Sequence, residues 1–336
     1  MEISKWKDKV FSATYYNFRE MALNIFRMQY ERNEVYKTYV NTIGIDPSKV
    51  NLIEEIPFLP VGFFKTNIIK TTEFNPEIIF ESSGTTGENT SRHYVKYLSV
   101  YKESFTGGFN LFYGKPHKWC ILALLPGYVE RQNSSLVKMV NDLIEESNNA
   151  HSGFYLYDQE KLYQALVHNE IRQQPTLLLG VTFALLDFAE KYSMKLRHTT
   201  IMETGGMKGR REEITREEIH KILMDKLGVQ NIHSEYGMTE LLSQAYSKSK
   251  GLFQCPPWMK ILIREENDPF AVTENSQNQK PSSGLLNIID LANLYSCSFI
   301  ATDDAGKLYE DGSFEVLGRR DASDMRGCSL LTADYP

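Results

Sequence analysis

Apolar residues in the first part of the chain recur with helical spacing. Four of them follow one another at steps of three and four residues, which aligns them along one face of a helix. They are Phe18, Met21, Ile25 and Met28. Pro57 ends this part of the chain. We therefore expect residues 1–58 to form a helical lead-in that packs on the body of the protein.

From residue 118 onward, short apolar runs alternate with amphipathic stretches. The apolar runs predict strands at 119–125, 153–157, 176–179, 199–203 and 229–234. The amphipathic stretches predict helices at 133–147, 159–170, 182–193 and 214–226, the last with a capping box between Thr215 and Glu218. This alternation favours a mainly parallel sheet covered on both faces, in which ligands bind at the carboxyl ends of the strands. We expect this α/β core to span residues 59–240.

After residue 240 the pattern changes to short strands separated by turns. We expect these strands at 243–247, 258–264, 284–290, 297–301 and 313–317. The polar segment 265–283 is predicted to be a mobile hairpin or a loop, and Asp311-Gly312 predicts a hairpin turn. Residues 241–336 should therefore form a small antiparallel, barrel-like subdomain followed by a C-terminal tail.

The composition is ordinary for a globular protein, with 24% charged and 42% hydrophobic residues among 336. A net charge of −6 provides no basic field that would attract nucleic acid, so we expect no nucleic-acid partner. No apolar run approaches the length of a membrane span, and the first residues do not resemble a signal peptide. We expect a cytoplasmic protein.

A loop rich in hydroxyl groups and glycine follows the apolar run that ends at Phe80. It consists of Ser82, Ser83, Gly84, Thr85, Thr86 and Gly87. Backbone amides and hydroxyls in such a loop can surround a polyphosphate, although the same composition is also typical of a plain surface turn. The Gly-Lys-Ser/Thr ending of a Walker loop is missing, which indicates adenylation rather than a P-loop NTPase.

Two further polar segments follow predicted strands, at residues 203–206 and 234–240. The second segment supplies an aromatic ring for a base in Tyr236, a glycine for close approach in Gly237, a hydroxyl in Thr239 and a carboxylate for Mg²⁺ in Glu240. Each of these residues taken alone fits an ordinary structural role. Their combination at the ends of successive strands favours a nucleotide site.

With these motifs the chain resembles the adenylate-forming superfamily of acyl- and aryl-CoA ligases, peptide-synthetase adenylation domains and luciferases. The loop at 82–87 is similar to the phosphate loop of that superfamily, and residues 236–240 are similar to its adenine and magnesium motif. Residues 301–304 resemble its Thr-Gly-Asp segment, and residues 318–321 resemble the segment that precedes its mobile C-terminal domain. The resemblance implies the α/β fold of the N-terminal domain of these enzymes.

The resemblance also implies roles for particular residues, with ATP and Mg²⁺ as cofactors. Thr239 would contact the α-phosphate, and Glu240 would hold the metal. Ribose would bind Asp304, with Asp303 as the alternative because it stands where the superfamily has glycine. The implied nucleotide contacts are Ser82, Ser83, Gly84, Thr85, Thr86, Gly87, Gly205, Gly206, Glu235, Tyr236, Gly237, Met238, Asp304 and Arg319. His93, shortly after the loop, is a further candidate for contact with phosphate or with the carboxylate of the acid.

Within the superfamily, the chain is most similar to the acyl-protein synthetases of bacterial luminescence. The shared features are a short chain, a helical lead-in and an ending around Arg-Gly-Cys-Ser-Leu, which here is residues 326–330. The resemblance selects Cys328 as the thiol that becomes acylated. It also implies that the mobile C-terminal domain is absent, because the chain stops at Pro336.

The other three cysteines show neither disulfide nor zinc spacing. We expect Cys120 to be a core thiol, Cys297 to be core or edge, and Cys255 to lie in a loop. The residues and the resemblance together predict ATP-dependent activation of a carboxylic acid, in particular a fatty acid, followed by acyl transfer to a thiol. An acyl-acceptor protein or reductase and a homodimer are candidate partners. The alternatives are a ligase that uses coenzyme A directly and a non-catalytic subunit that binds nucleotide or acyl groups.

Overall fold

The computed structural model describes residues 3–82, 90–125, 133–205, 215–274 and 281–319. Within these residues, thirteen strands form one mixed sheet and two more form a separate hairpin. The predicted α/β class is confirmed, and the expected parallel and antiparallel regions are both present. The antiparallel strands were expected in a separate small subdomain, whereas the parallel and antiparallel regions belong to a single continuous sheet.

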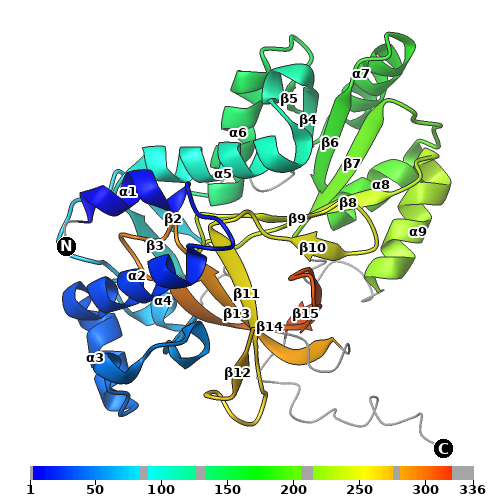
Figure 1. The fold of residues 1–336 in the computed structure, drawn as a ribbon. Helices are drawn as coiled ribbons and strands as arrows, with labels where there is room; N and C mark the ends of the chain where they lie inside the picture. The colour runs from blue at the N-terminus through cyan, green and yellow to red at the C-terminus, as the bar shows by residue number, and fades with distance from the viewer. Residues whose placement is uncertain (1–2, 83–89, 126–132, 206–214, 275–280, 320–336) are drawn as a thin grey trace, which may run out of the picture.

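The parallel region has the strand order β5-β4-β6-β7-β8. Its strands are β4 (Cys120–Leu124), β5 (Gly153–Phe154), β6 (Thr176–Val181), β7 (Thr199–Thr204) and β8 (Ile232–Tyr236). The connecting helices are α6 (Ser135–Ser147), α7 (Gln159–Ile171), α8 (Thr182–Lys191) and α9 (Arg216–Leu227). Helix α6 lies on one face of these strands, and α8 and α9 lie on the other (Figure 1). All residues of β4 and β6 are buried, as expected for strands covered on both faces.

Local signals explain the ends of several of these elements. The capping box predicted for α9 is present, because the Thr215 hydroxyl accepts from the Glu218 amide while the Glu218 carboxylate accepts from the Thr215 amide. The helix stops at Gly228, whose φ of 67° is a left-handed conformation that favours glycine. Strand β8 starts three residues later than predicted and ends two residues later, at Tyr236, so Glu235 and Tyr236 belong to the strand itself.

The antiparallel region continues from β8 in the order β9-β10-β15-β14-β13-β11-β12. These strands are β9 (Ala245–Ser247), β10 (Leu252–Gln254), β11 (Met259–Arg264), β12 (Val272–Thr273), β13 (Ser282–Asp290), β14 (Phe299–Leu308) and β15 (Phe314–Arg319). Strand β14 is much longer than predicted, so residues 301–304 lie within a strand. The predicted turn at Asp311-Gly312 joins β14 to β15, with Gly312 at a φ of 81°.

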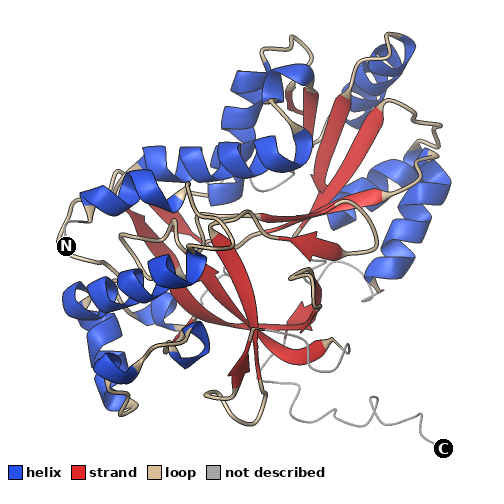
Figure 2. Ribbon diagram, viewed as in Figure 1, coloured by secondary structure: helices blue, strands red, loops and turns tan. Residues whose placement is uncertain are grey.

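The N-terminal segment is helical and lies beside the antiparallel strands (Figure 2). Its elements are α1 (Ser4–Val10), α2 (Phe18–Arg32), α3 (Glu34–Thr42), the short 3₁₀ turns Pro47–Lys49 and Ile53–Glu55, and α4 (Phe63–Thr66), with β1 (Leu59–Pro60) paired to β14. The apolar stripe predicted on α2 is buried. Gln29 extends from this helix into the turn between β13 and β14, where it donates to the Asn293 carbonyl at 3.0 Å and accepts from the Ser298 amide at 2.9 Å.

A separate antiparallel hairpin, β2 (Ile78–Glu81) and β3 (Arg92–Val95), lies between the N-terminal segment and helix α5 (Leu98–Tyr113). A short 3₁₀ turn, Pro116–Lys118, then leads into β4. The loop predicted to bind phosphate connects β2 to β3. Of its six residues, Ser82 is described, whereas residues 83–87 lie outside the described part of the chain. Across the described ranges, no helix combines the length and apolarity that crossing a membrane requires.

Candidate active site

The polar segments at 203–206 and 234–240 lie side by side at the carboxyl edge of the sheet. Strands β7 and β8 are parallel neighbours, with Thr204 opposite Glu235. The segments therefore share one edge, as the alternation of strands and helices predicts. Gly205 follows directly with a φ of 70°, a left-handed conformation suited to glycine, and Gly206 lies outside the described residues.

Tyr236, Asp304 and Arg319 form a chain of contacts across two regions of the sheet. The Tyr236 hydroxyl donates to Asp304 Oδ2 at 2.7 Å, and Arg319 Nε lies 3.9 Å from Asp304 Oδ1. Asp304 and Arg319 are cross-strand partners on β14 and β15. Burial and the Asp304 carboxylate raise the pKa of Tyr236, so its hydroxyl stays protonated. Of the two aspartates left open by the sequence, Asp304 faces the motif, whereas Asp303 is exposed.

The ring of Tyr236 also packs against two aromatic residues of the antiparallel region. Its centroid lies 5.9 Å from that of Phe253 and 5.8 Å from that of Phe314, both with edge-on geometry. These contacts fix the plane of the ring without stacking another protein ring on its face. The proposed stacking of adenine on Tyr236 stays a prediction.

Glu235 faces inward, toward β7. It is only 8% exposed, and the Thr204 hydroxyl donates to its Oε2. A Cβ atom at position 237 would lie 2.6 Å from Glu235 Oε1, so Gly237 leaves room for this carboxylate. Burial raises the pKa of Glu235 to about 7, with a further contribution from the charge of Glu203 and an opposing one from the Thr204 bond.

Glu203 is a second buried carboxylate at this edge, and sequence reasoning missed its partners. Its Oε1 lies 3.3 Å from Arg216 Nε and 3.6 Å from His220 Nε2, and its Oε2 lies 2.9 Å from the Thr182 hydroxyl. Burial alone would raise the pKa of Glu203, but the contacts with His220 and Arg216 outweigh it and lower the pKa. The Thr182 hydroxyl also lies 3.0 Å from the carbonyl oxygen of Gly205. The contacts of Glu203 and Thr182 therefore support the turn after β7.

Glu240 lies beside the stem of the β2–β3 hairpin. Its side chain is nearly buried, which raises the pKa of its carboxyl, while a hydrogen bond from the Ser91 side chain and the charge of Arg319 oppose that rise. Ser91 is in turn paired with Ser82, whose amide donates to the Ser91 carbonyl at 3.0 Å and whose hydroxyl accepts from the Ser91 amide at 2.9 Å. The start of the predicted phosphate loop and the predicted metal ligand therefore belong to one neighbourhood.

The turn between β13 and β14 holds the chain after Glu240, a role that sequence reasoning missed. Asn293 Nδ2 donates to the Glu240 carbonyl at 2.8 Å, and Asp290 Oδ2 accepts from the amides of Leu242 and Ser243, each at 2.9 Å. The only sequence signal for this turn is a pair of polar residues, Asp290 as the last residue of a long strand and Asn293 shortly after it.

The carboxylate of Glu240 fits a magnesium ion that is shared with phosphate groups. Mg²⁺ prefers oxygen ligands and binds through one or two carboxylates together with water and substrate phosphates. Over the described ranges there is no cluster of three or more His, Cys, Asp or Glu side chains that would hold a metal by itself. Cys328 lies outside the described residues.

A mixed sheet with these motifs at its parallel edge has the fold of the adenylate-forming enzymes. Residues 12–334 match the acyl-protein synthetase family LuxE, and the chain belongs to this family. None of the curated proteins compared with the chain matches its sequence significantly.

Solved structures with a similar fold include two acyl-CoA ligases. A 2-hydroxyisobutyryl-CoA ligase, solved in its postadenylation state with 2-HIB-AMP, has a TM-score of 0.64 at 9% identity, covering 89% of this chain and 66% of the ligase. A long-chain-fatty-acid-CoA ligase from Archaeoglobus fulgidus has a TM-score of 0.48 at 14% identity, covering 77% of this chain and 55% of the ligase. The chain thus spans little more than half the length of the archaeal ligase. At 9% identity, the likeness to the 2-hydroxyisobutyryl-CoA ligase concerns the fold alone.

Proposed function

We propose that the protein activates a fatty acid with ATP as an acyl-adenylate and then transfers the acyl group to the thiol of Cys328. The observation that carries the proposal is the convergence of Tyr236, Asp304 and Glu240 on one sheet edge, beside the stem of a hydroxyl-rich hairpin loop. Membership of a family of acyl-protein synthetases supports the acid and the protein thiol as substrates.

In the first half-reaction, an oxygen of the fatty-acid carboxylate attacks the α-phosphorus of ATP. The bond from that phosphorus to the bridging oxygen breaks, and pyrophosphate leaves with the electron pair. The protein contributes orientation and charge stabilisation to this step, without a nucleophile of its own. Asp304 would bind the ribose hydroxyls, Thr239 the α-phosphate and Glu240 the magnesium ion, which neutralises charge on the phosphate oxygens.

In the second half-reaction, the thiolate of Cys328 attacks the acyl carbonyl carbon, and AMP leaves. The three described cysteines are poorly suited to this role, because nucleophilic attack requires a thiolate. Burial raises the pKa of Cys120 and Cys255, and it raises the pKa of Cys297 to about 12. Each of these thiols is therefore held protonated near neutral pH.

The test supplies radiolabelled fatty acids of several chain lengths together with ATP and Mg²⁺. We expect ATP–pyrophosphate exchange that depends on the acid, and protein-bound label that hydroxylamine removes. Cys328→Ser should abolish the label and preserve exchange, whereas the matched variant Cys255→Ser should retain both.

Three outcomes would contradict parts of the proposal. Label that survives Cys328→Ser would remove this thiol from the reaction. Turnover that requires free coenzyme A and leaves no label would identify a CoA ligase instead. Nucleotide binding without exchange for any acid would identify a non-catalytic subunit.

A further inference from the structure

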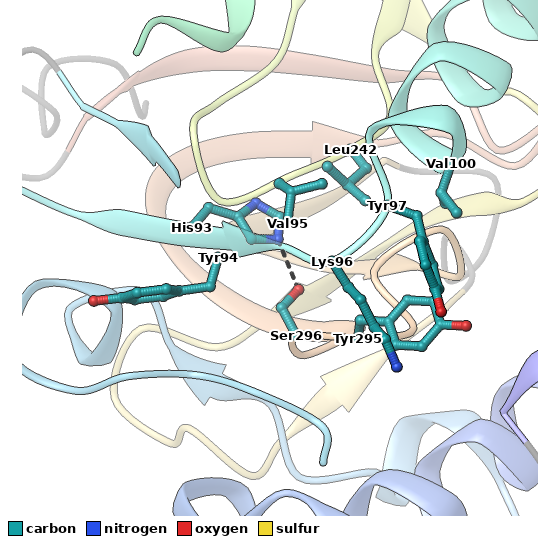
Figure 3. A pocket seen from close by; sticks show the side chains of 9 residues that line it. All are labelled: His93, Tyr94, Val95, Lys96, Tyr97, Val100, Leu242, Tyr295 and Ser296. Carbon is teal, nitrogen blue, oxygen red and sulfur yellow. Dashed lines mark hydrogen bonds between the residues drawn. The ribbon is translucent and has the colours of Figure 1, made fainter. Parts of the chain in front are cut away.

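His93 on β3 is buried and uses both ring nitrogens within the protein. It is 1% exposed, and its Nε2 lies 2.8 Å from the Ser296 hydroxyl (Figure 3). Its Nδ1 lies 2.9 Å from the Thr239 carbonyl oxygen. A carbonyl can only accept a hydrogen bond, so Nδ1 carries the proton and Nε2 accepts from Ser296. The ring also packs edge-on against Phe64, with centroids 5.8 Å apart.

The described residues around His93 enclose only a small cavity. The cavity beside its ring has a volume of about 10 Å³, close to the minimum that one water molecule needs. Burial also lowers the pKa of His93 to about 4, so the ring is neutral near neutral pH and offers no charge to phosphate. Direct contact with phosphate or with the acid, the expectation from the sequence, does not fit this environment.

His93 instead lies where three segments of the site meet. Two residues before it, Ser91 belongs to the hairpin stem beside Glu240. Its Nδ1 bonds to the main chain of the motif at Thr239, and its Nε2 bonds to the turn between β13 and β14. From the same turn, Asn293 donates to the carbonyl of Glu240. Two successive carbonyls of the motif are therefore held by buried side chains, which fixes the direction of the peptide between Thr239 and Glu240.

We propose that His93 is a positioning residue that sets Thr239 and Glu240 for the nucleotide through its Nδ1–H bond to the Thr239 carbonyl. The inference rests on the proposed adenylation, since it gives His93 an effect on ATP and Mg²⁺. It assigns the effect on ATP binding to Nδ1 alone. A variant that keeps a donor at this position can therefore distinguish positioning of the motif from general packing of the ring.

The experiment compares His93→Asn with His93→Gln. The amide nitrogen of asparagine takes the place of Nδ1 and can still donate to Thr239, whereas the glutamine amide takes the place of Nε2 and cannot. We expect His93→Asn to keep the KM for ATP within about threefold of wild type. His93→Gln should raise it at least about tenfold, with the KM for the acid unchanged in both. An equal decrease in melting temperature in both variants would show that a difference in packing does not cause their difference in KM for ATP. The exposed His117 provides the matched control, His117→Gln.

Each remaining result counts for or against the inference. Equal losses of ATP affinity in the asparagine and glutamine variants, in proportion to melting temperature, would reduce His93 to a structural residue. Wild-type kinetics in His93→Gln would overturn the inference while leaving the proposed adenylation intact. A wild-type protein that neither exchanges pyrophosphate nor binds ATP with Mg²⁺ in calorimetry would overturn both.

Discussion

The hydroxyl of Tyr236 donates a 2.7 Å hydrogen bond to Asp304, which lies 68 positions further along the chain. Tyr236 is the last residue of the parallel strand β8, and Asp304 lies within the antiparallel strand β14. The bond therefore joins the two regions of the sheet at the edge where the nucleotide motifs gather. It also orients the carboxylate that we assign to the ribose.

Removing this hydroxyl should impair both stability and ATP binding. In Tyr236→Phe the ring and its contacts with Phe253 and Phe314 remain, but Asp304 loses a donor. Hydrogen bonds to charged groups contribute about 1.5–3 kcal/mol, so we expect the free energy of unfolding to fall by about 2 kcal/mol. The KM for ATP should rise several-fold, and the KM for the acid should not change.

Urea denaturation and ATP–pyrophosphate exchange would measure these two effects. Tyr309→Phe is a matched control, because the Tyr309 hydroxyl donates to Glu315 at the turn end of the β14–β15 hairpin. This control should leave the KM for ATP at its wild-type value. An unchanged KM for ATP in Tyr236→Phe would argue against Asp304 as the ribose contact.

Replacing the carboxylate of Glu240 should remove most of the adenylation activity. Glu240→Gln retains the shape and the oxygen of the side chain but loses its charge, which weakens a magnesium ligand. Because a metal ion supplies several kcal/mol of charge stabilisation, we expect ATP–pyrophosphate exchange to fall at least about 100-fold. Raised Mg²⁺ concentrations should restore part of it. The exposed Glu310 offers the control Glu310→Gln. Exchange near the wild-type rate in Glu240→Gln would refute the metal role.

Sequence reasoning succeeded where local signals decide the structure. The capping box at Thr215 and the turn at Gly312 depend on a few neighbouring residues, and both appear as predicted. The order of strands and helices between residues 118 and 236 also followed from periodicity. It placed the segments containing Thr204 and Glu235 at the same edge of the sheet.

The contacts within the site depend on pairing between distant segments, which periodicity does not reveal. Strand β14 extends through Asp304 because it pairs with β13 on one side and β15 on the other. The burial of His93 depends on Thr239 and Ser296, both far away in sequence. Local composition at these positions is equally compatible with an exposed loop, so tertiary contacts decided the outcome.

Arg216 should matter chiefly because it accompanies the buried carboxylate of Glu203. It lies 3.3 Å from that carboxylate and also donates to the Val316 carbonyl at 2.8 Å, which ties α9 to β15. Removing one partner of a buried pair costs about 3–5 kcal/mol, and the partial exposure of Arg216 places Arg216→Ala near the lower end. The double variant with Glu203→Gln should recover part of that loss. Additive losses in urea denaturation would show that the pair is not coupled.

The effect of Arg216→Ala should also depend on pH. The folded protein holds the pKa of Glu203 below its ordinary value, so the contacts of the ionised carboxylate stabilise the fold. This stabilisation is fully present above the pKa of Glu203 in the unfolded chain, and it is lost as pH falls through the pKa in the folded protein. The difference between Arg216→Ala and wild type should therefore shrink in acid. A difference that stays constant from pH 7 down to pH 3 would contradict the assignment.

Glu235 should give the opposite dependence on pH. Its pKa is about 7 in the folded protein against an ordinary value of 4.5, so the folded state retains a proton that the unfolded state releases between these values. Stability then falls as pH rises through this window. The difference between the two pKa values corresponds to a total loss of about 3 kcal/mol in the free energy of unfolding.

Glu235→Gln cannot ionise and should lack this loss of stability. The free energy of unfolding of wild type minus that of the variant should therefore decrease by about 3 kcal/mol between pH 4.5 and pH 7.5. Thr204→Val provides the companion test, because the Thr204 hydrogen bond favours the ionised carboxylate. Loss of this hydrogen bond should raise the pKa of Glu235 in the folded protein, so the fall in stability should continue above pH 7. A difference between wild type and Glu235→Gln that is flat across the window would mean that Glu235 ionises in the folded protein as readily as in water, and that β7 and β8 do not isolate it from solvent.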